Sequence, residues 1–398
     1  MPRLVVVDDA RARHFAPFSS LRAWSAMPVG ALPVHDRWAF AFPGHALSLV
    51  TAAHLDGVTD TGTPARTHGV IPAGTIVANG RAACALRAAP RAELWTIGGA
   101  VAAVRLGVAV TVDELLEAPL DAFVPAGSTR AALDGAWCAA PWDAIGLLQS
   151  LLPDDLRVLA IDGDRPAGSR YDIIGEHPVS VGAGATIEPY VVFDTTAGAV
   201  VIQPGAHVSA FTRIAGPCWI GAGAHLLGGR ISGSVIGPQC RVHGDVSASI
   251  LAGYVNKAHE GFVGHSIIGR WANLGAGTTT SNLKNSYGEV RMWTPEGERA
   301  TGLTFLGALI GEHAKLGIGT MLGTGTLVGA GANLFGTLRP PKVVPPFAWG
   351  DAPPYETFSR EKFVEVATKV MARRQIALDE TQRLALARAY DHTLASSS

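Results

Sequence analysis

Aliphatic residues recur at every sixth position over much of the second half of the chain. Glycine follows many of these positions, at Gly182, Gly221, Gly237, Gly269, Gly275, Gly311, Gly317 and Gly329. The unbroken runs are Ile202, Val208, Ile214, Ile220 and Leu226, and then Ile310, Leu316, Leu322, Val328 and Leu334. This hexapeptide period predicts a left-handed parallel β-helix, in which aliphatic side chains stack inward and glycine permits tight corners. A β-sandwich also alternates apolar and polar residues, but it does not require a period of six.

Two stretches interrupt this period, at Gly244–Gly261 and Lys284–Phe305. A solenoid tolerates such excursions as loops on one face, and that face is often the functional one. We therefore expect loops at both places. Decorative insertions without a function are the alternative.

Residues 1–170 contain no hexads. Short apolar strands, such as Arg3–Val7 and Val158–Ile161, alternate with helix-prone segments such as Val112–Glu117. This alternation predicts an α/β domain, and Asp162–Gly168 has the composition of a linker after it.

The last segment, residues 351–398, has helical patterning. Ser359 is a suitable cap for a helix that places Phe363 and Val370 on one face, and a second helix is expected from Asp379. This tail is predicted to cap the open end of the solenoid or to pack on a neighbouring subunit.

Composition narrows the choice of protein class. The chain has 398 residues, a formal net charge of −1 and only 16% charged residues, so it lacks the basic surface of a nucleic-acid-binding protein. The most apolar stretch, Ile97–Val110, contains Arg105 and is too short to span a membrane. Met1–Ala10 lacks the features of a signal peptide, and the four cysteines are scattered, so a cytoplasmic protein with reduced cysteines is expected.

Histidine is the usual general base near neutral pH, and one histidine has an unusual position. His259 falls within the first excursion, in Asn-Lys-Ala-His-Glu-Gly-Phe over Asn256–Phe262. Most of the other histidines of the repeat region occupy ordinary hexad positions, which favours a structural or solvated role for them: His177, His207, His225, His243, His265 and His313. His259 is therefore the candidate base.

The sequence around His259 resembles a known family. After His259 come Asn-Leu-Gly-Ala-Gly-Thr over Asn273–Thr278 and then Ser-Asn at Ser281 and Asn282. This run is similar to the acetyltransferase domain of the bifunctional glucosamine-1-phosphate N-acetyltransferase / UDP-N-acetylglucosamine pyrophosphorylase family. The resemblance is closer still to an alternative, Bacteroidetes-type branch, whose marks also include the runs at Asn273–Gly288 and Ala348–Gly350.

The resemblance implies roles for several residues. His259 would take a proton from a sugar amine while that amine attacks the thioester of acetyl-CoA. Asn273 and Asn282 would hold the acceptor sugar. The backbone N–H of Ala276 would polarise the thioester carbonyl, as in an oxyanion hole.

Phosphate recognition departs from the better-known branch of that family. Arg230 falls where the family keeps a phosphate-binding arginine, but Ser247 stands near the position of a phosphate-binding lysine. Lys257 or Lys284 would have to substitute for that lysine. Phe262 stands where the family has a tyrosine near the base. These differences bear on the identity of the acceptor more than on acyl transfer.

The amino-terminal half echoes the alternative branch more weakly, and it lacks the glycine-rich nucleotide loop of the better-known one. Arg22 and Arg81 are candidates for binding phosphate, and Asp8 or Asp9 for ligating Mg²⁺. The alternative is that these are salt-bridged surface residues of a degenerate domain. This half is also short for a complete pyrophosphorylase.

Two further functions are compatible with a solenoid. Gamma-type carbonic anhydrases share this fold and bind zinc through three histidines, but His259 and His265 are separated by five residues rather than the four of that pattern. A non-catalytic scaffold would need only the solenoid, and the matches around His259 argue against it.

The sequence therefore predicts three parts: an α/β nucleotidyltransferase-like domain at 1–170, a left-handed β-helix acyltransferase domain at 171–350 and a helical tail at 351–398. The expected protein is a cytoplasmic homotrimer that acetylates glucosamine-1-phosphate or a similar amino sugar with acetyl-CoA. Its amino-terminal half would add a nucleotidyltransferase activity with UTP and Mg²⁺, in the supply of UDP-N-acetylglucosamine or a related sugar nucleotide. An acyltransferase with a degenerate amino-terminal domain is the alternative.

Overall fold

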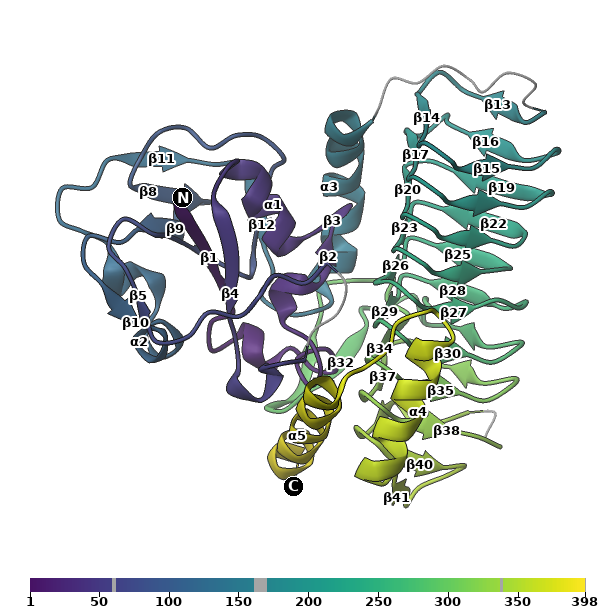
Figure 1. The fold of residues 1–398 in the computed structure, drawn as a ribbon. Coiled ribbons are helices and arrows are strands. Elements are labelled where there is room, and N and C mark those ends of the chain that lie inside the picture. The colour runs from purple at the N-terminus through teal and green to yellow at the C-terminus, as the bar shows by residue number, and fades with distance from the viewer. Residues whose placement is uncertain (59–61, 161–169, 337–338, 398) are drawn as a thin grey trace. The chain divides into compact units, whose positions relative to one another are not determined.

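A computed structural model describes residues 1–58, 62–160, 170–336 and 339–397 (Figure 1). The chain forms two compact units. One, here called the amino-terminal unit, consists of Met1–Phe15, Ser19–Asp143 and Leu378–Ala395. The other, the solenoid unit, consists mainly of Ala144–Ala377. The predicted linker at Asp162–Gly168 lies outside the described residues.

The amino-terminal unit is built on a mixed sheet with the strand order β11-β8-β9-β6-β1-β4. Strand β1 runs parallel to β4 and β6, whereas β9 runs antiparallel to β6 and β8. Residues 4–7 are all buried, which is typical of a strand covered on both faces, and the strand predicted at Arg3–Val7 is confirmed. The strands are β1 (Arg3–Val7), β4 (Ala46–Val50), β6 (Ile76–Asn79), β8 (Leu94–Ile97), β9 (Ala100–Arg105) and β11 (Arg130–Ala132).

Short elements complete this unit. Helix α2 (Val112–Glu117) forms as predicted, because Thr111 and Glu114 cap each other's backbone N–H groups in a capping box. Helix α1 (Val34–Ala41) precedes it in the chain. The short strands are β2 (Pro28–Val29), β3 (Leu32–Pro33), β5 (Val70–Ile71), β7 (Ala82–Cys84), β10 (Val110–Thr111) and β12 (Gly135–Trp137).

Helix α3 (Asp143–Leu159) replaces a predicted strand. Its buried positions Ile145, Leu148, Leu152 and Leu156 recur at helical spacing. Val158 is 49% exposed on the opposite side of this pattern. The strand predicted at Val158–Ile161 is therefore wrong over its described part, because the helix continues through Leu159.

The solenoid unit stacks short strands into three parallel sheets (Figure 1). The first sheet contains β13 (Asp172–Ile174), β16 (Val192–Asp194), β19 (Thr212–Ala215), β22 (Gly229–Ser232), β25 (Asp245–Ser247) and β28 (Phe262–Gly264). The second contains β14 (Val179–Val181), β17 (Val200–Ile202), β20 (Cys218–Ile220), β23 (Val235–Ile236), β26 (Ile250–Leu251), β29 (Ile267–Ile268), β34 (Ala308–Ile310), β37 (Thr326–Val328) and β39 (Val343–Val344). The third contains β15 (Thr186–Ile187), β18 (His207–Val208), β21 (His225–Leu226), β24 (Arg241–Val242), β27 (Asn256–Lys257), β30 (Asn273–Leu274), β35 (Lys315–Leu316), β38 (Asn333–Leu334) and β40 (Ala348–Gly350), with β41 (Glu356–Thr357) antiparallel to β40.

The core of the solenoid is the predicted stack of aliphatic side chains. In the third sheet these inward residues are Val208, Leu226, Val242, Leu274, Leu316 and Leu334, all at most 3% exposed. Each fully buried side chain of this size contributes about 1.5–3 kcal/mol. Lys257 interrupts the stack, because it pairs with inward-facing Val242. The predicted fold class, an α/β domain followed by a left-handed parallel β-helix and a helical tail, is confirmed.

The break predicted at Gly244–Gly261 is wrong, because β25, β26 and β27 continue the coil through it. Ile236 pairs with Leu251 of the next coil, and Leu251 pairs with Ile268 of the coil after that. The second of these coils is longer than the first. Coils of unequal length therefore shift the hexapeptide period without leaving the solenoid.

The break predicted at Lys284–Phe305 is confirmed. Ile268 pairs with Ile310, so the chain between these two strands is much longer than one coil. This intervening chain contains the antiparallel hairpin of β32 (Arg291–Thr294) and β33 (Gly297–Ala300). The hairpin follows β31 (Thr279–Thr280), which pairs with β36 (Met321–Leu322) in the next coil.

The first helix of the tail, α4 (Arg360–Ala372), lies along the solenoid (Figure 1). Ser359 caps it by accepting a hydrogen bond from the N–H of Lys362, as predicted. Phe363 is 2% exposed, and its ring lies 4.9 Å from that of Phe347, which lies between β39 and β40 in the last coil. This contact holds α4 against the solenoid.

The second predicted helix is α5 (Glu380–Ser397), and it belongs to the amino-terminal unit rather than to the solenoid. Arg388 donates a 3.0 Å hydrogen bond to the carbonyl of Asp56. The rings of His392 and His54 lie 4.0 Å apart. Burial lowers the pKa of His54 to about 4, so the His54 ring in this contact is neutral at neutral pH.

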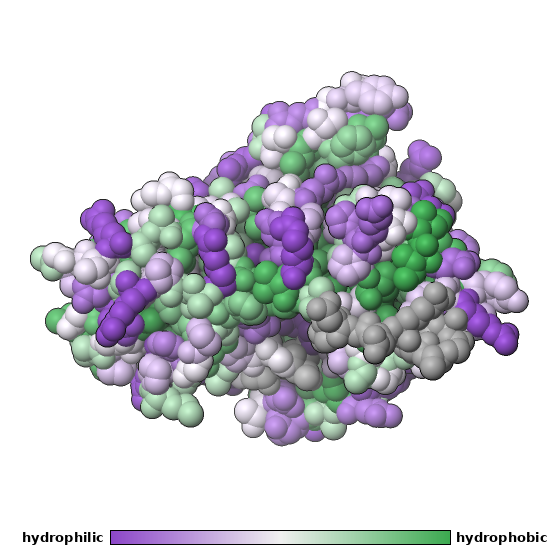
Figure 2. All heavy atoms as spheres, turned by 90° about the horizontal axis from the view of Figure 1, so that it is seen from above, coloured by the Kyte–Doolittle hydropathy of each residue, from purple (hydrophilic) through white to green (hydrophobic). Residues whose placement is uncertain are grey.

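Hydrophilic and hydrophobic side chains are interspersed on the face drawn in Figure 2. All four cysteines are buried and free, as predicted. No helix in the described part of the chain is long and apolar enough to cross a membrane.

Candidate functional site

His259 lies at a corner of the solenoid, in the turn between β27 and β28, with its side chain exposed. Asn256 pairs with Asn273 of the next coil, so the position equivalent to His259 in that coil is Ala276. The carbonyl of Glu260 accepts a 2.9 Å hydrogen bond from the N–H of Gly277, which joins the two corners. Neighbouring strands are about 4.8 Å apart. The candidate base and the candidate oxyanion donor are therefore neighbours in successive coils.

Lys257 points into the solenoid, two residues before His259. It is 2% exposed, and its Nζ donates hydrogen bonds to the carbonyls of His243, at 2.8 Å, and of His259. Burial lowers the pKa of Lys257 to about 8, although Glu260 and Asp245 oppose this shift. Because a buried ammonium group needs such partners, this geometry suits a residue that positions the His259 corner. It leaves the ammonium group little exposed surface for an acceptor.

Asn273 faces outward on the third sheet, three residues before Ala276. Its Oδ1 accepts a 2.8 Å hydrogen bond from Nδ2 of Asn256 in the preceding coil, which fixes the orientation of the amide. Both asparagines line a pocket of about 500 Å³. The predicted acceptor-binding residue thus faces a cavity large enough for a small molecule.

Asn282 belongs to a second group, beside the first sheet. Its Nδ2 donates to Nδ1 of His265 at 2.8 Å, and the His265 ring lies 5.2 Å from that of Phe305. Burial lowers the pKa of His265, which favours the neutral ring. A neutral His265 that accepts at Nδ1 carries its proton on Nε2. Asn282 is therefore engaged by a histidine for which the sequence predicted no special role.

Arg230 and Lys284 belong to other segments of the solenoid unit than the His259 corner. Ile231 pairs with Val246, and Val246 pairs with Val263 of β28, so Arg230 stands two coils before that strand. Lys284 begins the excursion, and its Nζ donates to the carbonyl of Glu289. No hydrogen bond or ion pair among the described residues connects either side chain with His259.

Asp8 lies at the carboxyl end of β1 in the amino-terminal unit and is 1% exposed. It accepts hydrogen bonds from the N–H of Ser25 at 3.0 Å and from the hydroxyl of Thr51 at 3.1 Å. Burial nevertheless raises its pKa to about 6. A Cβ atom at Gly80 would lie 2.3 Å from Oδ1 of Asp8, so the backbone of Gly80 closes over this carboxylate.

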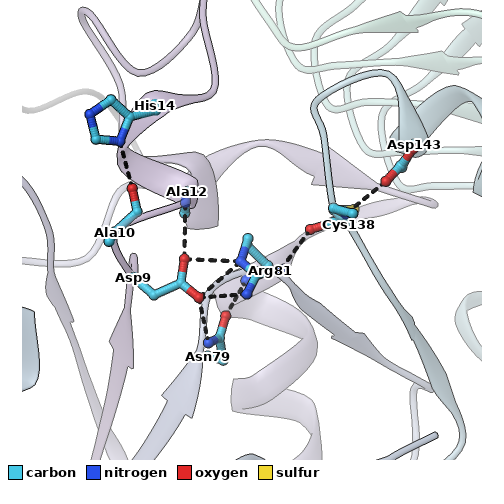
Figure 3. Close-up of polar contacts among 9 residues, drawn as sticks. Asp9, Ala10, Ala12, His14, Asn79, Arg81, Cys138 and Asp143 are labelled. Carbon is cyan, nitrogen blue, oxygen red and sulfur yellow. Dashed lines mark hydrogen bonds and ion pairs between the residues drawn. The ribbon is translucent and has the colours of Figure 1, made fainter. Parts of the chain in front are cut away.

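Asp9 forms an ion pair with Arg81 (Figure 3). Nε and Nη2 of Arg81 donate to it at 2.9 and 2.7 Å, and Nδ2 of Asn79 donates at 3.0 Å. Burial alone would raise the pKa of Asp9, but the hydrogen bonds from Arg81 and Asn79 hold it below its ordinary value. Arg81 also donates to the carbonyl of Cys138 at 3.1 Å. The charges and hydrogen-bonding groups of Asp9, Asn79 and Arg81 are therefore paired with one another within the protein.

This arrangement leaves little room for a magnesium ion, since Mg²⁺ binds carboxylate oxygens that are accessible to it. Asp8 is enclosed and Asp9 is neutralised by Arg81. Among the described residues, no three His, Cys, Asp or Glu side chains gather into a group that could hold a metal ion. The roles of Asp8 and Asp9 toward Mg²⁺ and of Arg81 toward phosphate stay predictions.

Arg22 lies beside a pocket, although the residue is only 8% exposed. It lines a pocket of about 230 Å³ together with Thr51 and Arg66. Its Nη1 donates to the hydroxyl of Thr63 at 3.4 Å. Thr51 directly follows β4, and ligands of α/β sheets bind at the carboxyl ends of parallel strands. The pocket beside Arg22 therefore lies at the edge of the sheet where α/β proteins bind ligands, and the predicted role of Arg22 toward phosphate stays a prediction.

The basic residues beside Asn273 were not predicted from the sequence. Arg241, Lys315, Arg373 and Arg374 line the same pocket of about 500 Å³. The signal that could have identified Arg241 and Lys315 is that each directly precedes the inward residue of its strand. Their alignment becomes visible only when the length of each coil is known.

Residues 4–162 match the sugar nucleotidyl transferase family. A stretch of 107 residues is 37% identical to the bifunctional protein GlmU of Jannaschia sp. (strain CCS1). That stretch covers 26% of this chain and 22% of the GlmU chain, so the similarity spans about a fifth of that relative.

These similarities, together with the β-helix, support a transferase of sugar-nucleotide biosynthesis with a nucleotidyltransferase-like amino-terminal unit. The assignment to the Bacteroidetes-type branch stays a prediction. Acetyl transfer and the identity of the substrates are matters of proposal.

Proposed function

We propose that the solenoid unit transfers an acetyl group from acetyl-CoA to the amine of an amino-sugar phosphate such as glucosamine-1-phosphate. The observation that carries this proposal is the corner where His259 stands beside Ala276 of the next coil. It offers a proton acceptor and a backbone N–H within one coil spacing, which is what acyl transfer to an amine requires.

The imidazole of His259 takes a proton from the sugar amine, and the amine nitrogen attacks the thioester carbon. The N–H of Ala276 stabilises the negative charge on the carbonyl oxygen of the tetrahedral intermediate. The carbon–sulfur bond then breaks, the thiolate of CoA takes up a proton, and an acetamide remains on the sugar.

Neighbouring residues would support this step. Lys257 fixes the backbone of the His259 corner through two carbonyls. Asn273, held by Asn256, is placed to bind the acceptor. The exposed side chain of His259 is open to a second copy of the chain, and we propose a homotrimer in which a neighbouring solenoid closes the site.

The amino-terminal unit is proposed to join the acetylated sugar phosphate to UMP, with UTP as donor and pyrophosphate as the leaving group. The match of residues 4–162 to the sugar nucleotidyl transferase family and the pocket beside Arg22 support this half of the proposal. No step is assigned to Asp8, Asp9 or a metal ion.

A coupled assay tests both halves. The purified chain receives glucosamine-1-phosphate, acetyl-CoA, UTP and Mg²⁺, and free thiol and pyrophosphate are followed separately. Release of both products supports a bifunctional enzyme. Thiol alone supports an acetyltransferase whose amino-terminal unit is degenerate or has another specificity. If neither product appears, the proposed substrates are wrong.

His259→Ala should lower kcat for thiol release by about 10²–10⁴-fold, because general base catalysis supplies a factor of this size. Its unfolding temperature should not change, since the side chain is exposed. His177→Ala is the matched control, because His177 is another exposed histidine of the solenoid unit, and it should keep full activity. Full activity of the His259→Ala variant would remove the central assignment.

A further inference from the structure

The pocket of about 500 Å³ in the solenoid unit has one wall of strands and one of helix. The strand wall is a ladder on the third sheet, since Arg241 pairs with Asn256, Asn256 with Asn273, and Asn273 with Lys315. All four side chains face outward, because the next residue of each strand occupies the inward position of the solenoid. Successive coils therefore align two cations and two amides on one surface.

The helical wall is the carboxyl end of α4, where Arg373 and Arg374 follow its last residue. Phe363 and Met371 are buried, at 2% and 3% exposure, so the helix is fixed on the solenoid. A helix dipole favours cations at this end by about 0.3–1 kcal/mol. The dipole accounts for two arginines at the end of the helix, but it does not explain why they line the same pocket as Arg241 and Lys315.

Two of the four basic residues that line the pocket donate hydrogen bonds to neutral carbonyl groups. Nη1 of Arg374 donates to the carbonyl of Gln239 at 3.0 Å. Nζ of Lys315 donates to the carbonyls of Trp271 and His313, at 2.8 and 3.1 Å. Among the described residues, none of those that line the pocket is acidic. By contrast, Lys362 and Lys369 on the exposed part of the same helix both pair with Glu365.

Burial, and for some groups a neighbouring positive charge, destabilises the charged forms of the basic residues around this pocket. Burial and then the nearby charge of Arg241 lower the pKa of Arg374. Burial and then Arg241 also lower the pKa of His225, which precedes Arg241 in the ladder. Burial lowers the pKa of Lys315 to about 7. A cluster of like charges that costs stability in the free protein is compensated when an anion binds.

We propose that this pocket binds the phosphate groups of a phosphorylated ligand, through Arg241, Arg374 and Lys315, with Asn256 and Asn273 contacting its neutral part. The planar guanidinium group donates two parallel hydrogen bonds to phosphate, which suits arginine to this task. The volume lies within the range of small-molecule sites.

Two phosphorylated substrates of the proposed reaction are candidates for this pocket. Asn273 belongs both to the pocket and to the coil that follows the His259 corner. The phosphates could therefore come from coenzyme A or from the amino-sugar phosphate. This choice of sources rests on the proposed acetyl transfer, whereas the anion site itself does not.

Isothermal titration calorimetry of the full chain with inorganic pyrophosphate at low salt tests the site. The double variant of Arg241→Gln and Arg374→Gln should bind pyrophosphate at least about tenfold more weakly than the wild type, because it loses two charge-assisted contacts. Arg360→Gln is the matched control, since Arg360 lies at the other end of α4 and pairs with Glu361. It should bind as the wild type does. Arg241→Gln alone provides a second variant if the double variant does not fold, because Arg241 is exposed.

Competition experiments identify the source of the phosphates. If coenzyme A displaces pyrophosphate in an arginine-dependent way, the pocket serves the acyl donor. If glucosamine-1-phosphate does so, it serves the acceptor. The proposal is overturned if the wild type does not bind pyrophosphate, or if the arginine variants bind it equally well. Arginine-dependent binding without any release of thiol would leave the anion site standing and reject the acetyl transfer.

Discussion

The two units hold their charged side chains in opposite ways. In the amino-terminal unit, Asp9 and Arg81 lie face to face, and both are less than a quarter exposed. In the solenoid unit, Arg241, Lys315 and Arg374 converge on a pocket whose described lining contains no carboxylate. The first arrangement is satisfied within the fold, because each charge is the partner of the other and removal of either would leave a partly buried charge unpaired. The second repels itself, and it suggests that the missing negative charge comes from a ligand.

This contrast shows that the presence of a charged residue is by itself a poor indicator of a functional site. Asp9 and Arg81 attracted a functional interpretation because their residue types can bind Mg²⁺ and phosphate, yet their hydrogen bonds are used within the protein. Lys315 and Arg374 attracted none, although they face a cavity. The partners of a charged group are therefore more informative than its residue type or its place in the chain.

Removal of Arg81 should give the largest effect on stability. Arg81→Met leaves the partly buried Asp9 carboxylate without its counterion, and the free energy of unfolding of the amino-terminal unit should fall by about 2–4 kcal/mol. Urea unfolding and hydrogen exchange of the β1 amide groups would measure this loss. Arg87→Met is the control, since Arg87 and Asp134 are 60% and 75% exposed and such pairs contribute about 0–1 kcal/mol.

A different result would change the comparison between the units. If Arg81→Met keeps its stability but loses affinity for UTP, Arg81 serves the ligand rather than the fold. The charged residues discussed in the two units would then both serve ligand binding.

Lowering the pH should also weaken the contribution of the Asp9–Arg81 ion pair to the unfolding free energy, with a smaller effect than the Arg81→Met substitution. The pKa of Asp9 is lowered by Arg81 in the folded state, so the pair contributes stability above the ordinary pKa of 3.8, and this stability is lost as the pH falls below it. The difference in unfolding free energy between the wild type and Arg81→Met should therefore shrink below about pH 4. Asp8, whose pKa is raised to about 6 mainly by burial, titrates at higher pH than Asp9 in the folded wild type, so its own contribution falls in a different part of the titration. A difference that stays constant throughout the acid titration would mean that Asp9 is not stabilised by Arg81.

The sequence predicted the solenoid because its fold repeats a local rule. Every inward position needs an aliphatic side chain, and Leu316, Leu322 and Val328 show this rule without any knowledge of the structure. The same rule gave a wrong prediction at Gly244–Gly261, because coils of unequal length shift the hexapeptide period there. It also could not anticipate Lys257, which occupies an inward position and bonds to the backbone of the His259 corner.

The candidate functional residues likewise include some that the sequence could predict and some that it could not. His259 could be predicted, because its surroundings resemble a known motif, and its proximity to Ala276 follows from one pairing of neighbouring coils. The basic pocket could not, since Arg241 and Lys315 are aligned by coils of different lengths and Arg374 arrives from the helical tail. The pairing of Asp9 with Arg81 joins strands of a sheet whose order no local pattern reveals.

Arg241→Gln should give the smallest effect and the sharpest test of the contrast. Arg241 is exposed and lies near the positive charge of Arg374, so its removal should leave the free energy of unfolding within about 0.5 kcal/mol of the wild type. The pKa of His225 should rise, because Arg241 is the largest cause of its lowering after burial, and an NMR titration of the histidines would measure this shift. Pyrophosphate should raise the unfolding temperature of the wild type more than that of the variant, because a ligand that binds more tightly stabilises the folded state more. A loss of about 2 kcal/mol, typical of a broken buried network, would instead make Arg241 a structural residue like Arg81, and the pocket would no longer differ from the ion pair in the amino-terminal unit.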